Sequence, residues 1–131
     1  VGASFADPSL RPIVLVGDGA FQMTGMEISV AVRYGLSPII IVLNNDGYLT
    51  ERLILEGQFN DITPWNYAGI TTLLNSGYSA KITTNQQFTD ELLAAKNRTE
   101  SFTLLEVMLD RLDCSEALKR LGEQLNSIVK N

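Results

Sequence analysis

The stretch from Pro12 to Gly47, PIVLVGDGAFQMTGMEISVAVRYGLSPIIIVLNNDG, decides the fold. Its second apolar run, Ile39 to Leu43, contains no polar residue, which is typical of a strand buried on both faces. Its first run, Pro12 to Val16, is short and β-rich. Between the runs, Ile28, Ala31 and Val32 recur at helical spacing. The stretch therefore predicts a strand, a helix and a second strand.

Local signals predict where this helix begins and ends. Thr24 followed by Glu27 fits a capping box, with the threonine as N-cap. Gly35 suits the C-terminal cap, and Pro38 follows shortly after it. We expect the positive, N-terminal end of this helix to point toward the ends of the two strands.

The rest of the chain continues the alternation of strands and helices. Segments 79–83 and 102–108 are predicted strands, and segments 49–55, 67–74, 87–96 and 116–129 are predicted helices. In the helix 87–96 we expect Phe88, Leu92, Leu93 and Ala95 to face inward. Strands separated by helices indicate a doubly wound α/β domain, with a mainly parallel sheet and helices on both faces.

Composition excludes several classes of function. The 131 residues carry a net charge of −5, which argues against nucleic acid as a partner. No apolar run approaches the roughly 20 residues of a membrane span. The chain has no histidine, which excludes a Ser-His-Asp triad or a His-ligated zinc within it. Its single cysteine, Cys114, is interpreted as structural and favours a reducing, cytoplasmic setting.

Polar residues follow both strands of the opening stretch. Gly17-Asp18-Gly19 ends one and Asn44-Asn45-Asp46-Gly47 ends the next. Parallel strands place these loops at one carboxyl edge, where such folds bind ligands. The Asp18 carboxylate would repel a bare diphosphate, so the pattern favours a magnesium ion between them. Its ligands would be Asp18, Asn45 and the carbonyl of Gly47, while Gly17 and Gly19 allow close approach of the phosphate.

These motifs resemble those of the thiamine diphosphate-dependent enzymes. Gly17-Asp18-Gly19, 24 intervening residues and Asn44-Asn45 match the cofactor motif of that family. Three further segments resemble its pyruvate and indolepyruvate decarboxylase branch, namely Asn44 to Glu51, Phe59 to Tyr67 and Leu105 to Met108. The resemblance covers nearly the whole chain. It implies the C-terminal, diphosphate-binding domain over residues 1–131, as a fragment lacking its N-terminal portion.

The resemblance also implies roles for individual residues. Asp18, Asn45 and Gly47 become magnesium ligands, and Glu51 a catalytic glutamate that handles protons. The expected cofactor-binding set is Gly17, Asp18, Gly19, Ala20, Asn45, Gly47, Tyr48 and Thr50. Ala20 stands where many relatives have a serine, and Thr50 where the decarboxylases usually carry an aliphatic residue. Tyr48 is equally open to packing or contact, and we interpret Asp61 and Trp65 as structural.

The implied function is the release of carbon dioxide and an aldehyde from a small 2-oxo acid. The implied cofactors are thiamine diphosphate and Mg²⁺, in an enzyme that forms a homodimer or homotetramer. Because a separate domain would hold the aminopyrimidine ring, we expect these 131 residues alone to be inactive. An acetolactate synthase-like carboligase and a non-catalytic α/β module are the alternatives.

Overall fold

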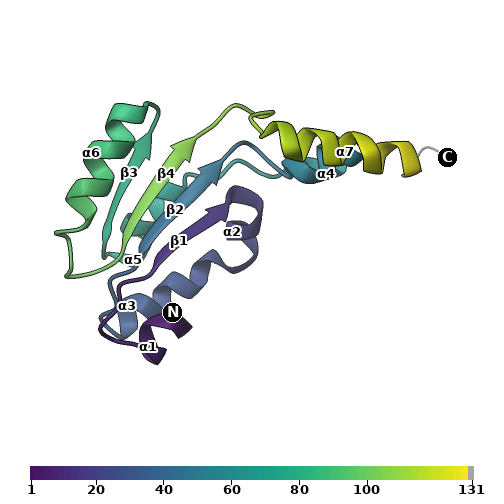
Figure 1. The fold of residues 1–131 in the computed structure, drawn as a ribbon. Helices are drawn as coiled ribbons and strands as arrows, with labels where there is room; N and C mark the ends of the chain where they lie inside the picture. The colour runs from purple at the N-terminus through teal and green to yellow at the C-terminus, as the bar shows by residue number, and fades with distance from the viewer. Residues whose placement is uncertain (130–131) are drawn as a thin grey trace.

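The computed structural model describes residues 1–129 and has a parallel sheet at its centre (Figure 1). The strands are β1 (Ile13–Gly17), β2 (Ile39–Asn44), β3 (Tyr78–Ile82) and β4 (Thr103–Met108). They stand in the order β1-β2-β4-β3, and every neighbouring pair is parallel. This arrangement confirms the predicted α/β class and the position of each predicted strand to within about a residue or two.

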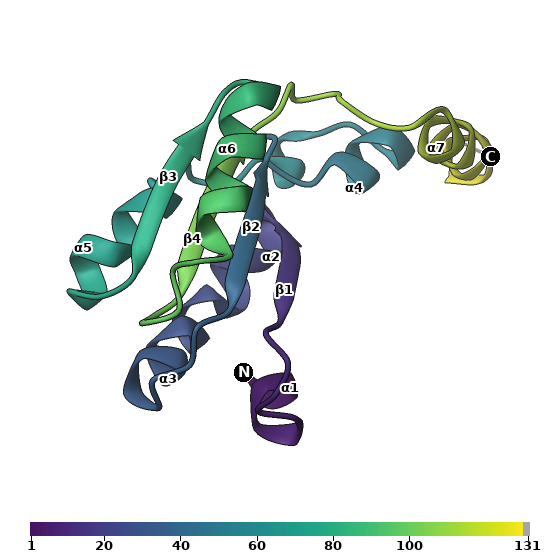
Figure 2. The same ribbon diagram turned by 60° about the vertical axis from the view of Figure 1, so that its left-hand side comes forward.

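Helical segments cover both faces of the sheet (Figure 2). On one face lie α2 (Asp18–Thr24), η1 (Gly25–Glu27), α3 (Ile28–Arg33), η3 (Tyr67–Gly69) and α5 (Ile70–Leu74). Helix α6 (Asn85–Ala95) lies on the other. The chain moves across the sheet in one direction from β1 to β3 and then steps back to β4. Because right-handed crossovers are strongly preferred, this reversal places α6 on the opposite face.

Each face has its own apolar core. Phe21, Ile28, Tyr67 and Ile70 pack on Val42 and Leu104 of the sheet, on the α2 side. On the α6 side, Ala95, Phe88 and Leu92 pack against Ile39 and Ile41. The prediction that Leu93 faces inward is wrong, because its side chain is 58% exposed. Phe88, Leu92 and Ala95 already form the stripe that faces the sheet, and Leu93 lies about 100° around the helix from Leu92.

The predicted capping box is also wrong. The helical segment begins at Asp18, directly after β1, and Thr24 is the last residue of α2. The Thr24 side chain makes no capping hydrogen bond to η1, the 3-10 turn that follows. The N-terminal end that faces the strand ends is therefore that of α2, whose N-cap, Gly17, lies seven residues before Thr24. Phe21 explains the earlier start, because a helix there buries its ring against Tyr67.

The predicted end of the helix is confirmed. Gly35 has φ +64, which favours glycine. Its N–H donates to Val32 O at 3.2 Å, and the N–H of Leu36 donates to Ala31 O at 2.9 Å. These two bonds form a Schellman motif, which satisfies the last carbonyls of the helix.

Four further helical segments lie outside these layers. They are α1 (Gly2–Ala6), α4 (Leu49–Ile54), η2 (Gln58–Asn60) and α7 (Glu116–Val129). Helix α7 projects away from the sheet and lies along α4 in both ribbon views (Figures 1 and 2). Their contact is close, since a Cβ atom at Gly122 would lie 2.5 Å from Cβ of Leu53. Within residues 1–129, no helix is long and apolar enough to cross a membrane.

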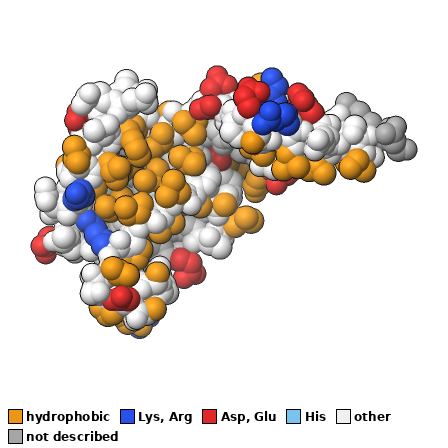
Figure 3. Space-filling model, viewed as in Figure 1, with side chains coloured by type: hydrophobic (Ala, Val, Ile, Leu, Met, Phe, Trp, Pro, Cys, Tyr) orange, Lys and Arg blue, Asp and Glu red, His pale blue; other side chains and the backbone are white. Residues whose placement is uncertain are grey.

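The α6 face of the sheet is covered over only part of its width. Helix α6 packs on β3 and β4, whereas Ile13 and Leu15 of the edge strand β1 are 57% and 67% exposed. Figure 3 shows hydrophobic side chains gathered over the sheet on this side. The apolar face of β1 is therefore open in this chain.

Candidate functional site at the carboxyl edge of the sheet

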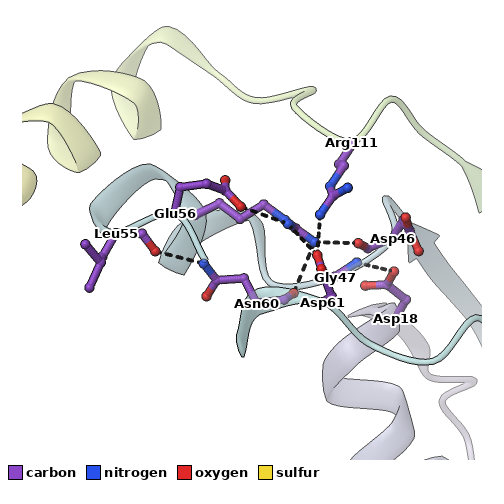
Figure 4. Close-up of polar contacts among 9 residues, drawn as sticks. Asp18, Asp46, Gly47, Leu55, Glu56, Asn60, Asp61 and Arg111 are labelled. Atoms are coloured by element: carbon purple, nitrogen blue, oxygen red, sulfur yellow. Dashed lines mark hydrogen bonds and ion pairs between the residues drawn. The ribbon is translucent and has the colours of Figure 1, made fainter. Parts of the chain in front are cut away.

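The two polar loops meet because β1 and β2 are adjacent and parallel. Gly17, the last residue of β1, pairs with Leu43 near the end of β2. Asp18 and the turn that contains Asn45 and Gly47 therefore leave the sheet side by side. Figure 4 shows Asp18 pointing toward this turn.

Asp18 is a buried carboxylate without a counter-charge. Asp18 is only 1% exposed. Oδ1 accepts a hydrogen bond from Gly19 N–H at 2.8 Å, and Oδ2 accepts one from Gly47 N–H at 3.0 Å. Both donors are neutral, and no lysine or arginine among residues 1–129 forms an ion pair with it. Because an unpaired buried charge is costly, this carboxylate is suited to a bound cation.

Asn45 brings further oxygen atoms to the same point. One atom of its side-chain amide lies 3.2 Å from Asp18 Oδ1 and 3.2 Å from the carbonyl oxygen of Gly47. If this atom is the nitrogen, it donates to both oxygens. If the amide turns its oxygen to this position, that oxygen lies 3.2 Å from each of the other two, close to the roughly 3.0 Å edge of a magnesium octahedron.

The cluster therefore fits a hard cation that takes oxygen ligands. Among the described residues, no three histidine, cysteine, aspartate or glutamate side chains gather closely enough to hold a metal ion. The Asp18 site differs from such clusters because it contains a single carboxylate, with an amide and a backbone carbonyl beside it. One or two protein carboxylates with neutral oxygens is the usual donor set for Mg²⁺ bound with phosphate.

The turn that carries these atoms requires glycine at position 47. Gly47 has φ +127, and the preceding Asp46 has φ +62. A Cβ atom at Gly47 would overlap Arg52 Nη2 and the carbonyl oxygen of Asn60. Asparagine and aspartate tolerate the left-handed conformation better than most residues, and only glycine fits the space at position 47.

The remaining predicted cofactor-binding residues lie around this cluster. Gly17 has open space where a Cβ atom would stand. Gly19 does not, because its Cβ atom would lie 2.5 Å from the ring of Tyr48, which packs there. The side chains of Ala20 and Thr50 are exposed. Gly19 thus has a packing reason to be glycine that the sequence did not indicate.

Glu51 lies in the first turn of α4, four residues after Gly47. Its side chain is exposed, in contrast to that of the next residue, Arg52. Among the described residues, no hydrogen bond or ion pair holds the Glu51 carboxylate. The described residues therefore leave this carboxylate without a partner, open to solvent.

Sequence reasoning missed Arg52, whose side chain is 1% exposed. Its Nη2 donates to the carbonyls of Asp46 at 2.8 Å and Asn60 at 3.1 Å, and Nη1 donates to Asp61 Oδ1 at 2.9 Å. Arg111, after β4, also pairs with Asp61 (Figure 4). These contacts were hard to predict from the sequence, because two of the acceptors of Arg52 are backbone oxygens.

Two further polar residues support the site from the sheet, the buried Glu106 and the half-buried Asn44. Glu106 of β4 accepts hydrogen bonds from Asn44 Nδ2 at 2.8 Å and from Ala68 N–H at 3.0 Å. Asn44 therefore ties β2 to β4, while its neighbour Asn45 reaches the Asp18 cluster.

Burial raises the pKa of the Tyr67 hydroxyl, a hydrogen bond from Gln22 opposes the rise, and the charge of Asp18 adds to it. Tyr67 stays protonated at neutral pH.

Residues 1–107 match the family model described as the C-terminal TPP binding domain of thiamine pyrophosphate enzymes. An alpha-keto-acid decarboxylase of Mycobacterium tuberculosis (strain ATCC 25618 / H37Rv) is 40% identical over 92% of this chain and 22% of its own length. A probable pyruvate decarboxylase of Schizosaccharomyces pombe is 38% identical over 97% of this chain and 23% of its own length. The chain thus spans less than a quarter of these curated relatives.

A solved structure supports the same relationship. The thiamine diphosphate-dependent 4-hydroxybenzoylformate decarboxylase of Rhodococcus jostii RHA1 superposes with a TM-score of 0.76 at 25% identity. The superposition covers 84% of this chain and 22% of the Rhodococcus chain.

Proposed function

This chain belongs to the thiamine pyrophosphate enzyme family, and we propose that it is the magnesium- and diphosphate-binding part of a 2-oxo acid decarboxylase. Residues 1–131 would form the C-terminal, cofactor-binding domain of a longer chain. The observation that carries the proposal is the Asp18 cluster, in which a buried carboxylate without a counter-charge lies 3.2 Å from the Asn45 amide, itself 3.2 Å from the carbonyl oxygen of Gly47.

Asp18, Asn45 and the Gly47 carbonyl would hold Mg²⁺. The ion would neutralise the carboxylate on one side and the diphosphate on the other. Its charge would therefore offset the repulsion between these two negative groups. For this, the Asn45 amide turns its oxygen toward the cluster. Its position 3.2 Å from both partners requires no other movement of the residue.

The surroundings of the cluster leave room for the diphosphate. Open space at Gly17 admits a phosphate close to the backbone. Ala20 and Thr50 are exposed beside it, and Tyr48 packs on Gly19 as a wall of the site. Bound thiamine diphosphate would supply the electron sink that loss of carbon dioxide requires. Glu51, exposed on α4, would give or take a proton at the reacting carbon.

The proposed substrate is a small 2-oxo acid, and the products are carbon dioxide and an aldehyde. The two relatives and the Rhodococcus enzyme are all named as decarboxylases of 2-oxo acids, which supports this class. The full enzyme would be a cytoplasmic homo-oligomer. We expect residues 1–131 alone to produce no aldehyde, because the resemblance to the decarboxylases implies that a separate domain holds the aminopyrimidine ring.

The test uses the full-length protein that contains this chain. After removal of metal with a chelator, wild type should retain thiamine diphosphate only when Mg²⁺ is returned, and Asp18→Ala should not retain it at any Mg²⁺ concentration. Product analysis with pyruvate should give aldehyde rather than an acetohydroxy acid. Normal retention and turnover in Asp18→Ala would refute the metal site, and an acetohydroxy acid product would identify a carboligase.

A further inference from the structure

We propose that Arg52 is a positioning residue, whose guanidinium fixes the peptide units on both sides of Gly47 and so orients the Gly47 carbonyl toward the cation. This inference rests on the proposed magnesium site. It concerns a residue that touches neither the cation nor the cofactor and acts through the backbone of the turn.

The peptide unit between Asp46 and Gly47 is held at both of its polar atoms. Its carbonyl, Asp46 O, accepts from Arg52 Nη2 at 2.8 Å. Its N–H, on Gly47, donates to Asp18 Oδ2 at 3.0 Å. A peptide group is planar, so fixing its carbonyl and its N–H fixes its orientation. Arg52 and Asp18 therefore hold this unit from opposite sides.

The next peptide unit, between Gly47 and Tyr48, is held through Asn60. The N–H of Tyr48 donates to Asn60 O at 3.0 Å, and Arg52 Nη2 donates to the same oxygen at 3.1 Å. Asn60 itself is 1% exposed, and its Nδ2 donates to Leu55 O at the end of α4. This unit carries Gly47 O, the proposed ligand, and its plane is set by a carbonyl that Arg52 holds in place.

The turn needs such a restraint. Asp46 is a non-glycine residue with φ +62, and such a conformation persists only where the surrounding structure holds it in place. Gly47 also has a positive φ, of +127. Without the guanidinium, the two peptide units would be free to relax and to turn Gly47 O away from Asp18.

Stability alone does not account for a buried arginine here. The side chain is 1% exposed, and its Nε has no hydrogen-bond partner among the described residues. A buried ion pair often stabilises no better than an apolar residue of the same volume. What an apolar residue lacks is the planar fork of donors that joins Asp46 O, Asn60 O and Asp61 at once.

The experiment measures the Mg²⁺ requirement in the full-length protein. Metal-free protein at fixed thiamine diphosphate is titrated with MgCl₂, and bound thiamine diphosphate is measured by equilibrium dialysis. We expect Arg52→Met to raise the half-saturating Mg²⁺ concentration by about 10- to 100-fold, the usual effect of losing a residue that orients a metal ligand. Saturating Mg²⁺ should restore full retention, which separates this variant from Asp18→Ala.

Two further variants make the result decisive. Arg52→Lys keeps the charge that pairs with Asp61 but loses the fork, and we expect a smaller shift in the same direction. Arg11→Met removes an arginine that donates to backbone carbonyls at the opposite edge of the sheet and should leave the Mg²⁺ requirement unchanged.

An unchanged Mg²⁺ requirement in both Arg52 variants would overturn the inference while leaving the magnesium site intact. If Arg52→Met does not fold, Arg52→Lys alone decides. Cofactor retention by wild type without Mg²⁺ would refute the proposed function, and this inference with it.

Discussion

An arginine stabilises each edge of the sheet, and the two arginines do different things. At the amino edge, Arg11 precedes β1 and donates to the carbonyls of Ser37, Ala95 and Arg98, which lie in the approaches to β2 and β4. At the carboxyl edge, Arg52 donates to the carbonyls of Asp46 and Asn60. The carbonyls at Arg11 lie 26, 84 and 87 residues from it in the sequence, whereas those at Arg52 lie only 6 and 8 residues away.

The difference lies in what surrounds each arginine. Arg11 forms no ion pair within residues 1–129, and the carbonyls it binds are those of ordinary chain connections. The carbonyls at Arg52 belong to a strained turn that borders the uncompensated carboxylate of Asp18. At the amino edge, an arginine bound to carbonyls simply joins chain segments. At the carboxyl edge, the arginine-bound turn lies beside three polar groups that are close together, the Asp18 carboxylate, the Asn45 amide and the Gly47 carbonyl. Only the second arrangement includes a buried carboxylate that forms no ion pair within residues 1–129.

The largest expected difference between the edges concerns exposed glutamates. In the full-length enzyme, Glu51→Gln should lower turnover by about 100-fold or more, the range for a lost general acid or base, with thiamine diphosphate retention near normal. Glu100, also exposed, lies at the amino edge before β4. Glu100→Gln should leave turnover unchanged. Equal turnover in wild type and Glu51→Gln would assign Glu51 to the solvated surface of α4.

Sequence patterns predicted the contrast between the edges only in part. The run Ile39–Leu43 predicted a strand buried on both faces, and β2 is buried from Ile39 to Val42 because side chains of the helices pack on each of its faces. The parallel pairing then brought Asp18 beside Gly47, as the spacing of the motifs indicated. A pattern of this kind is robust because it depends on burial and topology rather than on one contact.

What the sequence did not reveal depends on tertiary contacts. Thr24 and Glu27 form a capping box in sequence, yet the burial of Phe21 draws the start of the helix back to Asp18. The role of Arg52 was hidden because the acceptors through which it holds the turn are carbonyls of residues 46 and 60, and every residue has a carbonyl. The capping box was thus overruled by packing, and the role of Arg52 had no pattern in the sequence.

Two glycines with positive φ sharpen the comparison further. Gly47 has no space for a Cβ atom, whereas a Cβ atom at Gly35, near the amino edge, would meet nothing within 4 Å. Strain of about 1–3 kcal/mol in the turn would raise the half-saturating Mg²⁺ concentration of Gly47→Ala by roughly 5- to 150-fold. MgCl₂ titration of cofactor retention measures this.

Gly35→Ala is the matched control. It should lower the free energy of unfolding by about 1 kcal/mol, through the strained helix end, and leave the Mg²⁺ requirement as in wild type. A shift in the Mg²⁺ requirement with Gly35→Ala, or none with Gly47→Ala, would show that the two edges are not independent in this way.

The smallest expected effect is a difference in pH dependence. A hydrogen bond from Arg52 holds the pKa of Asp61 below its ordinary value, and the charges of Arg111 and Arg52 add to this. The contribution of Asp61 to stability is therefore fully present above its ordinary pKa, near pH 4, and is lost as the pH falls through the lower folded value.

Arg11 binds carbonyls, which do not titrate. The thermal midpoint gap between wild type and Asp61→Asn should stay constant from about pH 5 to 7 and narrow below about pH 4. The difference in thermal midpoint between wild type and Arg11→Met should not narrow below about pH 4. If the differences for Arg11→Met and Asp61→Asn depend on pH in the same way, the Arg52–Asp61 pair contributes nothing of its own to stability.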